Sequence, residues 1–373
     1  MPVEVPEQAL RRHITALNVR FRWMLLPTVI GAASRLFSII VILLANRLGG
    51  GNHHPFAVWD GQWYLRIARD GYHAQALGVH RTTGVEWHDF AFFPAWPGVI
   101  RLGSTLLGPI GLHQRSVAFL LANGLFVVAA ILIWRVLADR FGGRTATAGT
   151  ALLAFAPPAY VFSLAYSESL FVLLAALSFA VSRSLWRGPI GFAASLTRIA
   201  GLAIVASATV MAFRTHGPRR RGALAASVGG LLGFAAWWAF IAVLTGSPTG
   251  FMSGSPEWVP NPGLGQLPRV FLEPSIQQTG WLAYMVVVAI SALLLVRREL
   301  ELGLFVLATL AMCLLPGSAM HSMPRYLLAA FPLFAGIGDR LTSRKALVAV
   351  LVAFALGQAL FALWTVPSHR TAP

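Results

Sequence analysis

The chain is organised around one polar stretch that follows its first apolar run: Trp59-Asp60-Gly61-Gln62-Trp63-Tyr64-Leu65-Arg66-Ile67-Ala68-Arg69-Asp70-Gly71-Tyr72. At about 100° per residue, Trp63, Tyr64 and Ile67 fall on one arc and the polar side chains fall on the other, which is typical of a short amphipathic helix. Such a helix lies at a membrane surface. Asp60 projects from its first turn toward the apolar arc, so we expect its carboxylate near the boundary between lipid head groups and water.

The composition excludes an ordinary soluble domain. Hydrophobic residues make up 57% of the 373 residues and charged residues only 11%, whereas soluble domains carry about 25% charged residues. The net charge of +16 comes from short basic clusters between apolar runs, a pattern that sets membrane topology and does not form a nucleic-acid-binding face. The sequence therefore predicts an all-α, polytopic membrane helix bundle that forms a single domain over residues 1–373.

The basic N-terminus places the start of the first span, at about 24–45, in the cytoplasm. The polar stretch that follows is then outside. The run after Phe92-Phe93-Pro94-Ala95-Trp96-Pro97 is too short and interrupted to cross the ~30 Å hydrocarbon core, so we expect two surface helices in a long first outer loop. The alternative, a true span at this second run, would place Arg140 and Arg144 outside and invert everything downstream.

About eleven membrane segments are expected in total. Further spans are predicted at about 116–137, 147–162, 169–181, 224–244, 281–296, 302–315, 327–337 and 346–364. The apolar run 189–213 has basic clusters on both sides and is interrupted at Arg198 and Gly201. Two half-length helices that enter and leave by the same face account for both features, and such broken helices often mark binding sites.

Few charged side chains are expected on the outer side, and these are the candidates for chemistry. Asp60, set among aromatic residues, suits a general base that takes a proton from an acceptor hydroxyl. The alternative is an N-cap that satisfies free backbone N–H groups. Arg325, with Tyr326 beside it and His321 one helical turn earlier, could hold a lipid-linked phosphate by a charge-assisted pair; alternatively, Arg325 is a stray topology charge and His321 a solvated loop residue.

Arg198 is unusual because a guanidinium inside an apolar segment costs roughly 2.5–3.5 kcal/mol on insertion scales and is usually paired or faces a polar cavity. Glu168 opens a predicted span, where it either contacts substrate or caps the helix. The predicted site consists of catalytic Asp60 and His321, donor-phosphate-binding Arg325 and Arg198, and substrate-binding Trp59, Trp63, Tyr64, Glu168 and Tyr326. No metal and no cofactor are expected, because the histidines of the first outer stretch lack a recognisable ligand spacing and the single cysteine, Cys313, lies in an apolar run.

Five motifs occur in the order seen in PIG-V-type mannosyltransferases of the GT-C superfamily. They are the stretch from Trp59 to Tyr72, Phe92-Phe93-Pro94-Ala95-Trp96-Pro97, Tyr166-Ser167-Glu168-Ser169-Leu170-Phe171, Ser195-Leu196-Thr197-Arg198-Ile199-Ala200-Gly201-Leu202 and Arg325-Tyr326. The chain resembles this family over most of its length, and departs from it at Ile199-Ala200, where the family commonly has a proline-containing pair. The resemblance implies a helix bundle with two surface helices in its first outer loop, a polyprenyl-phosphate sugar donor, and a catalytic carboxylate that maps to Asp60.

Residues and resemblance together predict an inverting glycosyltransferase of the cell membrane. It would move mannose from polyprenyl-phosphate-mannose to a glycolipid or glycan acceptor on the extracytoplasmic side, with membrane lipids and no nucleic acid as further partners. Two other classes stay open. A lipid-linked glycan ligase would use basic groups, and not a carboxylate, as its key outer residues. In a lipid-linked sugar transporter or flippase, acids and arginines would line a pathway; the absence of a recognisable internal repeat counts against it.

Overall fold

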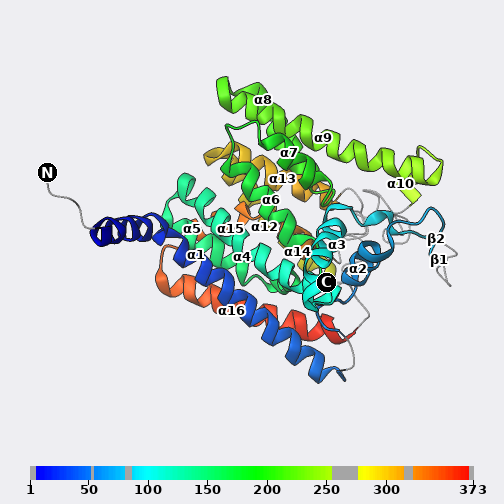
Figure 1. Cartoon of the computed structure of the whole chain (residues 1–373). Coiled ribbons are helices and arrows are strands. Elements are labelled where there is room, and N and C mark those ends of the chain that lie inside the picture. Colours follow the sequence, from blue (N-terminus) through cyan, green and yellow to red (C-terminus); the bar gives the residue numbers. More distant parts are fainter. Residues whose placement is uncertain (1–5, 52–53, 80–85, 254–275, 315–321, 369–373) are drawn as a thin grey trace.

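The computed structural model describes residues 6–51, 54–79, 86–253, 276–314 and 322–368 (Figure 1). In these ranges the chain is a helix bundle, as predicted from its hydropathy, with one small antiparallel hairpin formed by β1 (Gly78–Val79) and β2 (Glu86–Trp87). Strands of two residues carry no alternating pattern that a sequence analysis could detect. The predicted all-helical architecture is confirmed in the described residues. The small hairpin is a feature that the sequence did not predict.

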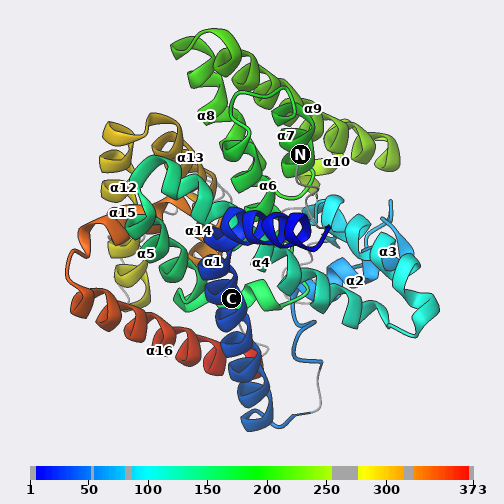
Figure 2. The ribbon, with the colours of Figure 1, turned by 60° about the vertical axis from the view of Figure 1, so that its left-hand side comes forward.

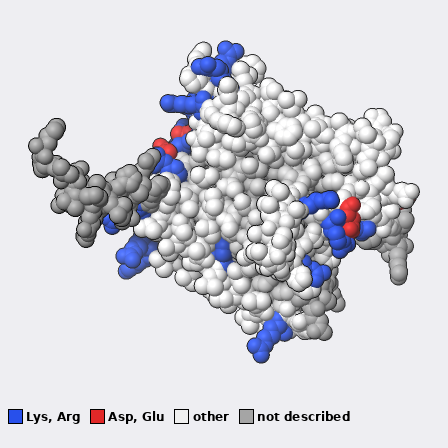
Figure 3. All heavy atoms as spheres, viewed as in Figure 1, with Lys and Arg blue, Asp and Glu red and all other residues white. Residues whose placement is uncertain are grey.

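Among the described residues, four helices are long and apolar enough to cross a membrane. They are Arg22–Leu48 of α1 (Pro6–Leu48), α4 (Gln114–Phe141), α9 (Gly217–Thr245) and Arg344–Pro367 of α16 (Arg344–Ser368). These helices expose large apolar side chains such as Leu36, Leu120 and Leu356, and Figure 3 shows a wide uncharged surface between charged groups near the ends of the bundle. Apolar surface of this extent is suited to lipid and not to water. The protein is an integral membrane protein.

The remaining helices pack between and beside these spans (Figures 1 and 2). They are α2 (Asp60–Asp70), η1 (Asp89–Ala91), α3 (Ala95–Leu107), η2 (Gly108–Ile110), α5 (Gly143–Ala154), η3 (Pro157–Ser163), α6 (Glu168–Ala180), α7 (Arg187–Ser195), α8 (Gly201–Arg214), α10 (Gly250–Ser253), α12 (Ile276–Arg298), α13 (Leu300–Leu314), α14 (Met323–Leu327) and α15 (Pro332–Arg340). Of these, α2, α3 and α10 lie at the end of the bundle that carries the hairpin. The two helices expected after the first span are present as α2 and α3.

Two of the predicted spans are not continuous helices. The run 147–162 is divided between α5 and η3, and η3 meets α6 at an angle of 98°. The run 327–337 is divided between α14 and α15. Proline explains both errors, because Pro157 and Pro332 stand at the first positions of η3 and α15 and have no N–H group to continue a preceding helix. The described residues therefore do not reproduce a count of eleven membrane segments.

A buried arginine satisfies the backbone at the first of these breaks. Arg35 of α1 donates from Nη1 to the carbonyl of Ala159 (2.9 Å) and to Ser163 Oγ (3.1 Å), and from Nη2 to the carbonyl of Ala154 (3.2 Å). Its guanidinium carbon lies 4.2 Å from the centroid of the Phe126 ring. Carbonyl groups that lose their helical partners in an apolar interior must find other donors. One side chain of α1 thus supports the turn from α5 into η3.

The predicted pair of half-length helices is confirmed as α7 and α8, joined by a turn over residues 196–200. Both helices pack on α9, which is apparent in two views (Figures 1 and 2). The contact between α7 and α9 is made by backbone atoms: a Cβ added at Gly229 would lie 2.1 Å from the carbonyl oxygen of Gly188, and one at Gly233 would lie 2.4 Å from that of Phe192. Small residues allow such close approach between membrane helices.

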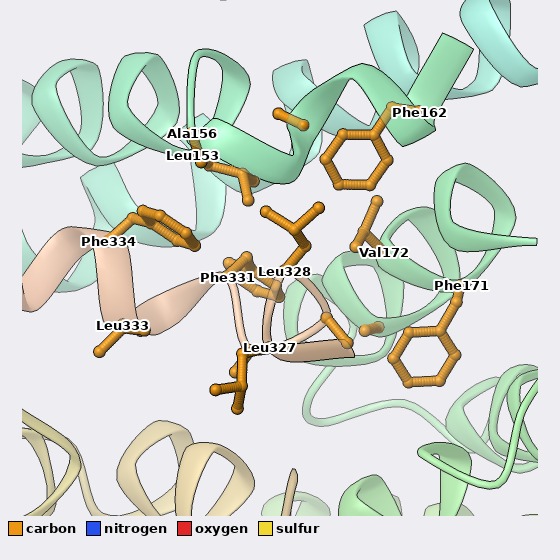
Figure 4. Close-up of a cluster of buried hydrophobic side chains, with 14 of the residues drawn as sticks. Leu153, Ala156, Phe162, Phe171, Val172, Leu327, Leu328, Phe331, Leu333 and Phe334 are labelled. Carbon is orange, nitrogen blue, oxygen red and sulfur yellow. The ribbon is translucent and has the colours of Figure 1, made fainter. Parts of the chain in front are cut away.

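The central apolar core fixes α14 beside η3 and α6. Leu327, Leu328 and Phe331, on α14 and the turn after it, are fully buried, and Figure 4 shows them among side chains of η3 and α6 such as Phe162 and Phe171. Close van der Waals packing of such side chains stabilises contacts between membrane helices. The residue two positions before Leu327 is Arg325, so this packing determines where its guanidinium group lies.

Gly229→Ala should destabilise the protein. The new methyl group meets a backbone carbonyl that cannot rotate away, and overpacking of this kind costs about 1–3 kcal/mol. Gly124→Ala on α4 is the matched control, because a Cβ there meets nothing within 4 Å and alanine favours the helix by up to ~1 kcal/mol. Thermal unfolding of both variants in detergent measures the difference; equal unfolding temperatures would contradict the close contact between α7 and α9.

Candidate active site

The site begins with an unusual backbone conformation at the start of α2. Trp59 has a φ of +51° and is the only non-glycine residue with positive φ in the described part of the chain. A bulky residue in this conformation costs of order 1–3 kcal/mol and persists only where its surroundings enforce it. Trp59 packs against the central core, and the next turn of the chain brings Gly61 against Ala165 and Tyr166. The unfavourable backbone conformation of Trp59 therefore sets the direction of the first turn of α2.

The amphipathic character predicted for α2 is confirmed. Tyr64 and Ile67 are buried, whereas Gln62 and Arg69 are exposed. Trp63 stacks on Phe92, with ring centroids 5.5 Å apart and 12° between the ring planes. This stack ties α2 to the Phe92-Pro97 motif that leads into α3. The polar face of α2 stays accessible while its apolar face is fixed.

Asp60 does not act as a helix cap. No side chain makes a capping hydrogen bond at the start of α2, and Asp60 Oδ2 instead lies 2.8 Å from Arg325 Nη1. The side chain of Asp60 is 19% exposed and that of Arg325 only 3%. The alternatives of an N-cap for Asp60 and a stray topology charge for Arg325 are therefore wrong. The pair places a partly accessible carboxylate on a buried, fixed guanidinium group.

Glu168 and Arg198 complete what we call the four-charge cluster, which consists of Asp60, Glu168, Arg198 and Arg325. Arg325 Nε lies 3.4 Å from Glu168 Oε1, and Arg198 Nη1 forms an ion pair with the same oxygen. Two carboxylates and two guanidinium groups give no net formal charge, which is the condition under which charges are tolerated in an apolar interior. The four residues come from α2, α6, the 196–200 turn and α14.

Aromatic rings enclose the guanidinium groups of the cluster. The guanidinium carbon of Arg325 lies 5.1 Å from the centroid of the Tyr166 ring and 4.8 Å from that of Tyr326. The guanidinium carbon of Arg198 lies 5.1 Å from the Tyr326 ring. Contacts of this type stabilise a desolvated cation by about 2 kcal/mol or more. Both arginines therefore converge on Tyr326.

Ser167 links the cluster to α2. The hydroxyl groups of Tyr64 and Ser167 share a hydrogen bond of 2.9 Å, and Arg198 Nη1 donates to Ser167 Oγ at 3.4 Å. Burial raises the pKa of the Tyr64 hydroxyl well above its usual value, so this group stays protonated. Ser167 and Tyr166 were not among the predicted site residues, although both lie in the motif that contains Glu168. The residues around this motif are mostly apolar, so the sequence contained no further feature that would have identified Tyr166 and Ser167 as site residues.

The cluster offers unoccupied polar atoms to a ligand. Glu168 Oε2 and the Tyr166 hydroxyl are buried and make no hydrogen bond within the described ranges. A buried polar group without a partner costs about 1–3 kcal/mol, so a ligand hydroxyl that donates to Glu168 Oε2, or a ligand oxygen that accepts from the Tyr166 hydroxyl, would be favoured here. In the same ranges, no three His, Cys, Asp or Glu side chains gather in a way that could hold a metal ion. The predicted site residue His321 lies outside the described residues.

Fold and site together define a polytopic membrane protein with a buried, charge-balanced polar site at the start of an amphipathic helix. Comparison with known families is more specific. The model of the family described as Mannosyltransferase (PIG-V) matches residues 26–217, more than half of the 373-residue chain. The chain belongs to this family. The matched range contains Asp60, Glu168 and Arg198.

The chain is also similar to individual proteins, over part of their length. The GPI alpha-1,6-mannosyltransferase 2 of Cricetulus griseus is 37% identical over 123 residues, which cover 31% of this chain and 22% of that protein. Among solved structures, the Archaeoglobus fulgidus oligosaccharyltransferase in complex with Zn and sulfate has a TM-score of 0.49 at 13% identity, over 90% of this chain and 54% of its own. ArnT from Cupriavidus metallidurans, bound to undecaprenyl phosphate, has a TM-score of 0.48 at 17% identity, over 86% and 62%.

Glu168→Gln should destabilise the protein far more than loss of an exposed ion pair. Removing this carboxylate leaves two buried guanidinium groups with only Asp60 to balance them, and breaking a buried pair costs about 3–5 kcal/mol. Asp139→Asn is the control, because its pair with Arg135 is half exposed and worth at most about 1 kcal/mol. Thermal unfolding in detergent compares the two; a Glu168→Gln variant as stable as the control would show that the cluster is not charge-coupled.

Proposed function

We propose that this protein is an inverting mannosyltransferase that moves mannose from polyprenyl-phosphate-mannose to a hydroxyl group of a glycolipid or glycan acceptor. The observation that carries the proposal is the pairing of Asp60, a partly exposed carboxylate, with the buried Arg325 in a chain of the PIG-V family. We place the protein in the cell membrane as a single domain over residues 1–373. The site would face the extracytoplasmic side, since basic clusters favour the cytoplasmic ends of the spans.

Asp60 is the general base in this proposal. Its Oδ2 atom is held by Arg325 Nη1, which leaves Oδ1 to accept a hydrogen bond from the acceptor hydroxyl. Asp60 takes the hydroxyl proton as the acceptor oxygen attacks the anomeric carbon of the mannose. The bond between that carbon and the phosphate oxygen breaks on the opposite face, and polyprenyl phosphate leaves with the electron pair. One displacement inverts the configuration at the anomeric carbon.

The two arginines have different tasks in this scheme. The side chain of Arg198 is 13% exposed and that of Arg325 is 3% exposed, which supports Arg198 as the residue that contacts the donor phosphate and Arg325 as the one that positions Asp60. The leaving phosphate gains negative charge in the transition state, and a preorganised guanidinium group stabilises it there. His321 stays a candidate for proton transfer near the phosphate.

Aromatic side chains would bind the sugar and the lipid. Tyr326 faces both arginines, so a mannosyl phosphate held by Arg198 would lie beside its ring. Trp59 and Trp63 are partly exposed near the start of α2, where the polar sugar and the polyprenyl chain of one donor would meet. Rings with an apolar body and a polar atom suit this boundary. Tyr64 is buried and would act on the substrate through its hydrogen bond to Ser167. Glu168, through its unpaired Oε2 atom, would accept a hydrogen bond from a substrate hydroxyl.

Asp60→Asn should reduce sugar transfer by about 10²–10⁴-fold, because the amide keeps the shape of the side chain but cannot take a proton. Asp60→Glu should lose on the order of 10²-fold, since it keeps the base but displaces it by ~1 Å. Asp70→Asn is the control, because Asp70 lies at the exposed end of the same helix and forms a salt bridge with its exposed neighbour Arg69. The assay is transfer from radiolabelled polyprenyl-phosphate-mannose by purified protein.

Thermal unfolding of each variant should be followed alongside, so that loss of fold is separated from loss of chemistry. A fully active Asp60→Asn variant of normal stability would remove Asp60 from the mechanism. Reconstituted liposomes offer a second check on the class of protein. Movement of the lipid-linked sugar across the bilayer without transfer to any acceptor would contradict the enzyme proposal and favour a flippase.

Arg198→Lys and Arg325→Lys should affect different kinetic constants. Lysine keeps the charge but cannot form a two-pronged contact with phosphate or bridge two carboxylates. We expect Arg198→Lys to raise KM for the donor by roughly 10–100-fold, the equivalent of one charge-assisted hydrogen bond of about 1.5–3 kcal/mol. Arg325→Lys should mainly lower kcat, since it misaligns Asp60. Steady-state kinetics with each substrate varied in turn test this division, and identical profiles for both variants would contradict it.

A further inference from the structure

A second group of arginines, one fully buried and two partly exposed, lies at the other end of α6 from the four-charge cluster. Arg187 of α7 and Arg219 of α9 pair with Glu301 of α13, and Arg140 of α4 contacts the same Phe179 ring as Arg187. We call these three arginines the arginine cluster. Arg140 and Arg187 contact Phe179, near the end of α6, whereas Glu168 is its first residue. At 1.5 Å per residue the two ends of α6 are roughly 16 Å apart, so the arginine cluster is a separate site.

The arginine cluster is held in place by specific contacts. Arg187 Nη2 lies 2.7 Å from Glu301 Oε1, and Arg187 Nε donates to Ser178 Oγ at 3.2 Å. Arg219 Nη2 lies 3.9 Å from Glu301 Oε2. Arg140 Nη2 donates to the carbonyl of Phe179 at 3.3 Å, and the guanidinium carbons of Arg140 and Arg187 lie 5.8 and 5.9 Å from the centroid of that same phenyl ring. The three groups therefore converge.

Unlike the four-charge cluster, this group is not balanced. Two of the three guanidinium groups pair with one buried carboxylate, that of Glu301, and the negative charge of Glu299 also acts on Arg140, which leaves three positive charges against two negative ones. Three nitrogen atoms, Arg140 Nη1, Arg187 Nη1 and Arg219 Nε, are buried and make no hydrogen bond in the described part of the chain. Arg187 as a whole is 0% exposed. Glu301 Oε2 is buried and likewise makes no hydrogen bond in the described residues, so it can serve at most part of these donors. The excess of positive charge over carboxylates is unfavourable in an apolar interior, and an anion would balance it.

We propose that the arginine cluster binds a phosphate group, either on the head group of an anionic membrane lipid or free in solution. Guanidinium groups are suited to phosphate because their planar forks donate two parallel hydrogen bonds. The position fits a lipid head group: Arg140 lies in the last turn of α4 and Arg219 near the start of α9, the ends of two helices that cross the membrane. A bound phosphate ties α4, α7 and α9 together.

Thermal unfolding of the whole protein in a non-ionic detergent tests the proposal. Phosphatidylglycerol added to the micelles should raise the unfolding temperature by at least about 3 °C, whereas zwitterionic phosphatidylcholine should not. Arg140→Gln and Arg219→Gln should each lose at least half of this shift. Arg135→Gln is the matched control for Arg140→Gln, because Arg135 lies on the same helix and pairs with Asp139 outside the arginine cluster; it should keep the full shift.

A parallel series with inorganic phosphate, compared with chloride at equal ionic strength, separates the two sources. A shift with inorganic phosphate that Arg140→Gln and Arg219→Gln reduce identifies a soluble phosphate, and a shift with phosphatidylglycerol alone identifies the lipid. If neither ligand stabilises the protein, or if both variants respond like the wild type, water alone satisfies these arginines and the proposal is overturned. Native mass spectrometry of the wild type gives an answer without variants, since retained phosphatidylglycerol adducts are expected and their absence would contradict the lipid.

Discussion

The rest of the site depends on the ion pair between Arg325 and Asp60. A guanidinium group that is almost fully buried needs carboxylates within a few ångströms, because its desolvation is otherwise too costly. Asp60 follows the first membrane span and Arg325 precedes the last helices, so the pair joins segments that are far apart in the sequence. Glu168 and Arg198 are drawn to the same point by the same requirement. Apolar packing places α14 beside α6, and charge balance in that apolar interior brings the start of α2 to the same point.

Interrupted helices make this meeting possible, and each interruption has its own compensation. Arg35 supplies hydrogen bonds to carbonyl groups at the turn from α5 into η3, which leads the chain to Glu168. The close contact at Gly188 and Gly229 holds α7 against α9, and the turn after α7 carries Arg198. Each break removes some backbone hydrogen bonds of a continuous helix. It also lets charged side chains from several segments lie side by side.

Local patterns in the sequence were enough to predict part of this arrangement. The apolar arc of α2 and the half-length helices α7 and α8 were predicted because periodicity and flanking charges are properties of neighbouring residues. The runs 147–162 and 327–337 were mistaken for spans because averaged hydropathy does not register single prolines. The pairing of Arg325 with Asp60 could not be predicted, since no local pattern encodes a contact between distant segments. Tyr166 belongs to the site because its ring packs against the guanidinium group of Arg325, a contact that no local pattern predicts.

A structure of the protein with polyprenyl phosphate and an acceptor analogue tests the central claim most directly, because the claim is geometric. If Asp60 is the base and Arg325 positions it, the acceptor hydroxyl should lie about 2.6–3.2 Å from Asp60 Oδ1, with Oδ2 still on Arg325 and the lipid phosphate on Arg198. An acceptor bound elsewhere, with no substrate atom within hydrogen-bonding distance of Asp60, would contradict the account. The four charges would then be a structural ion-pair network and not the catalytic centre.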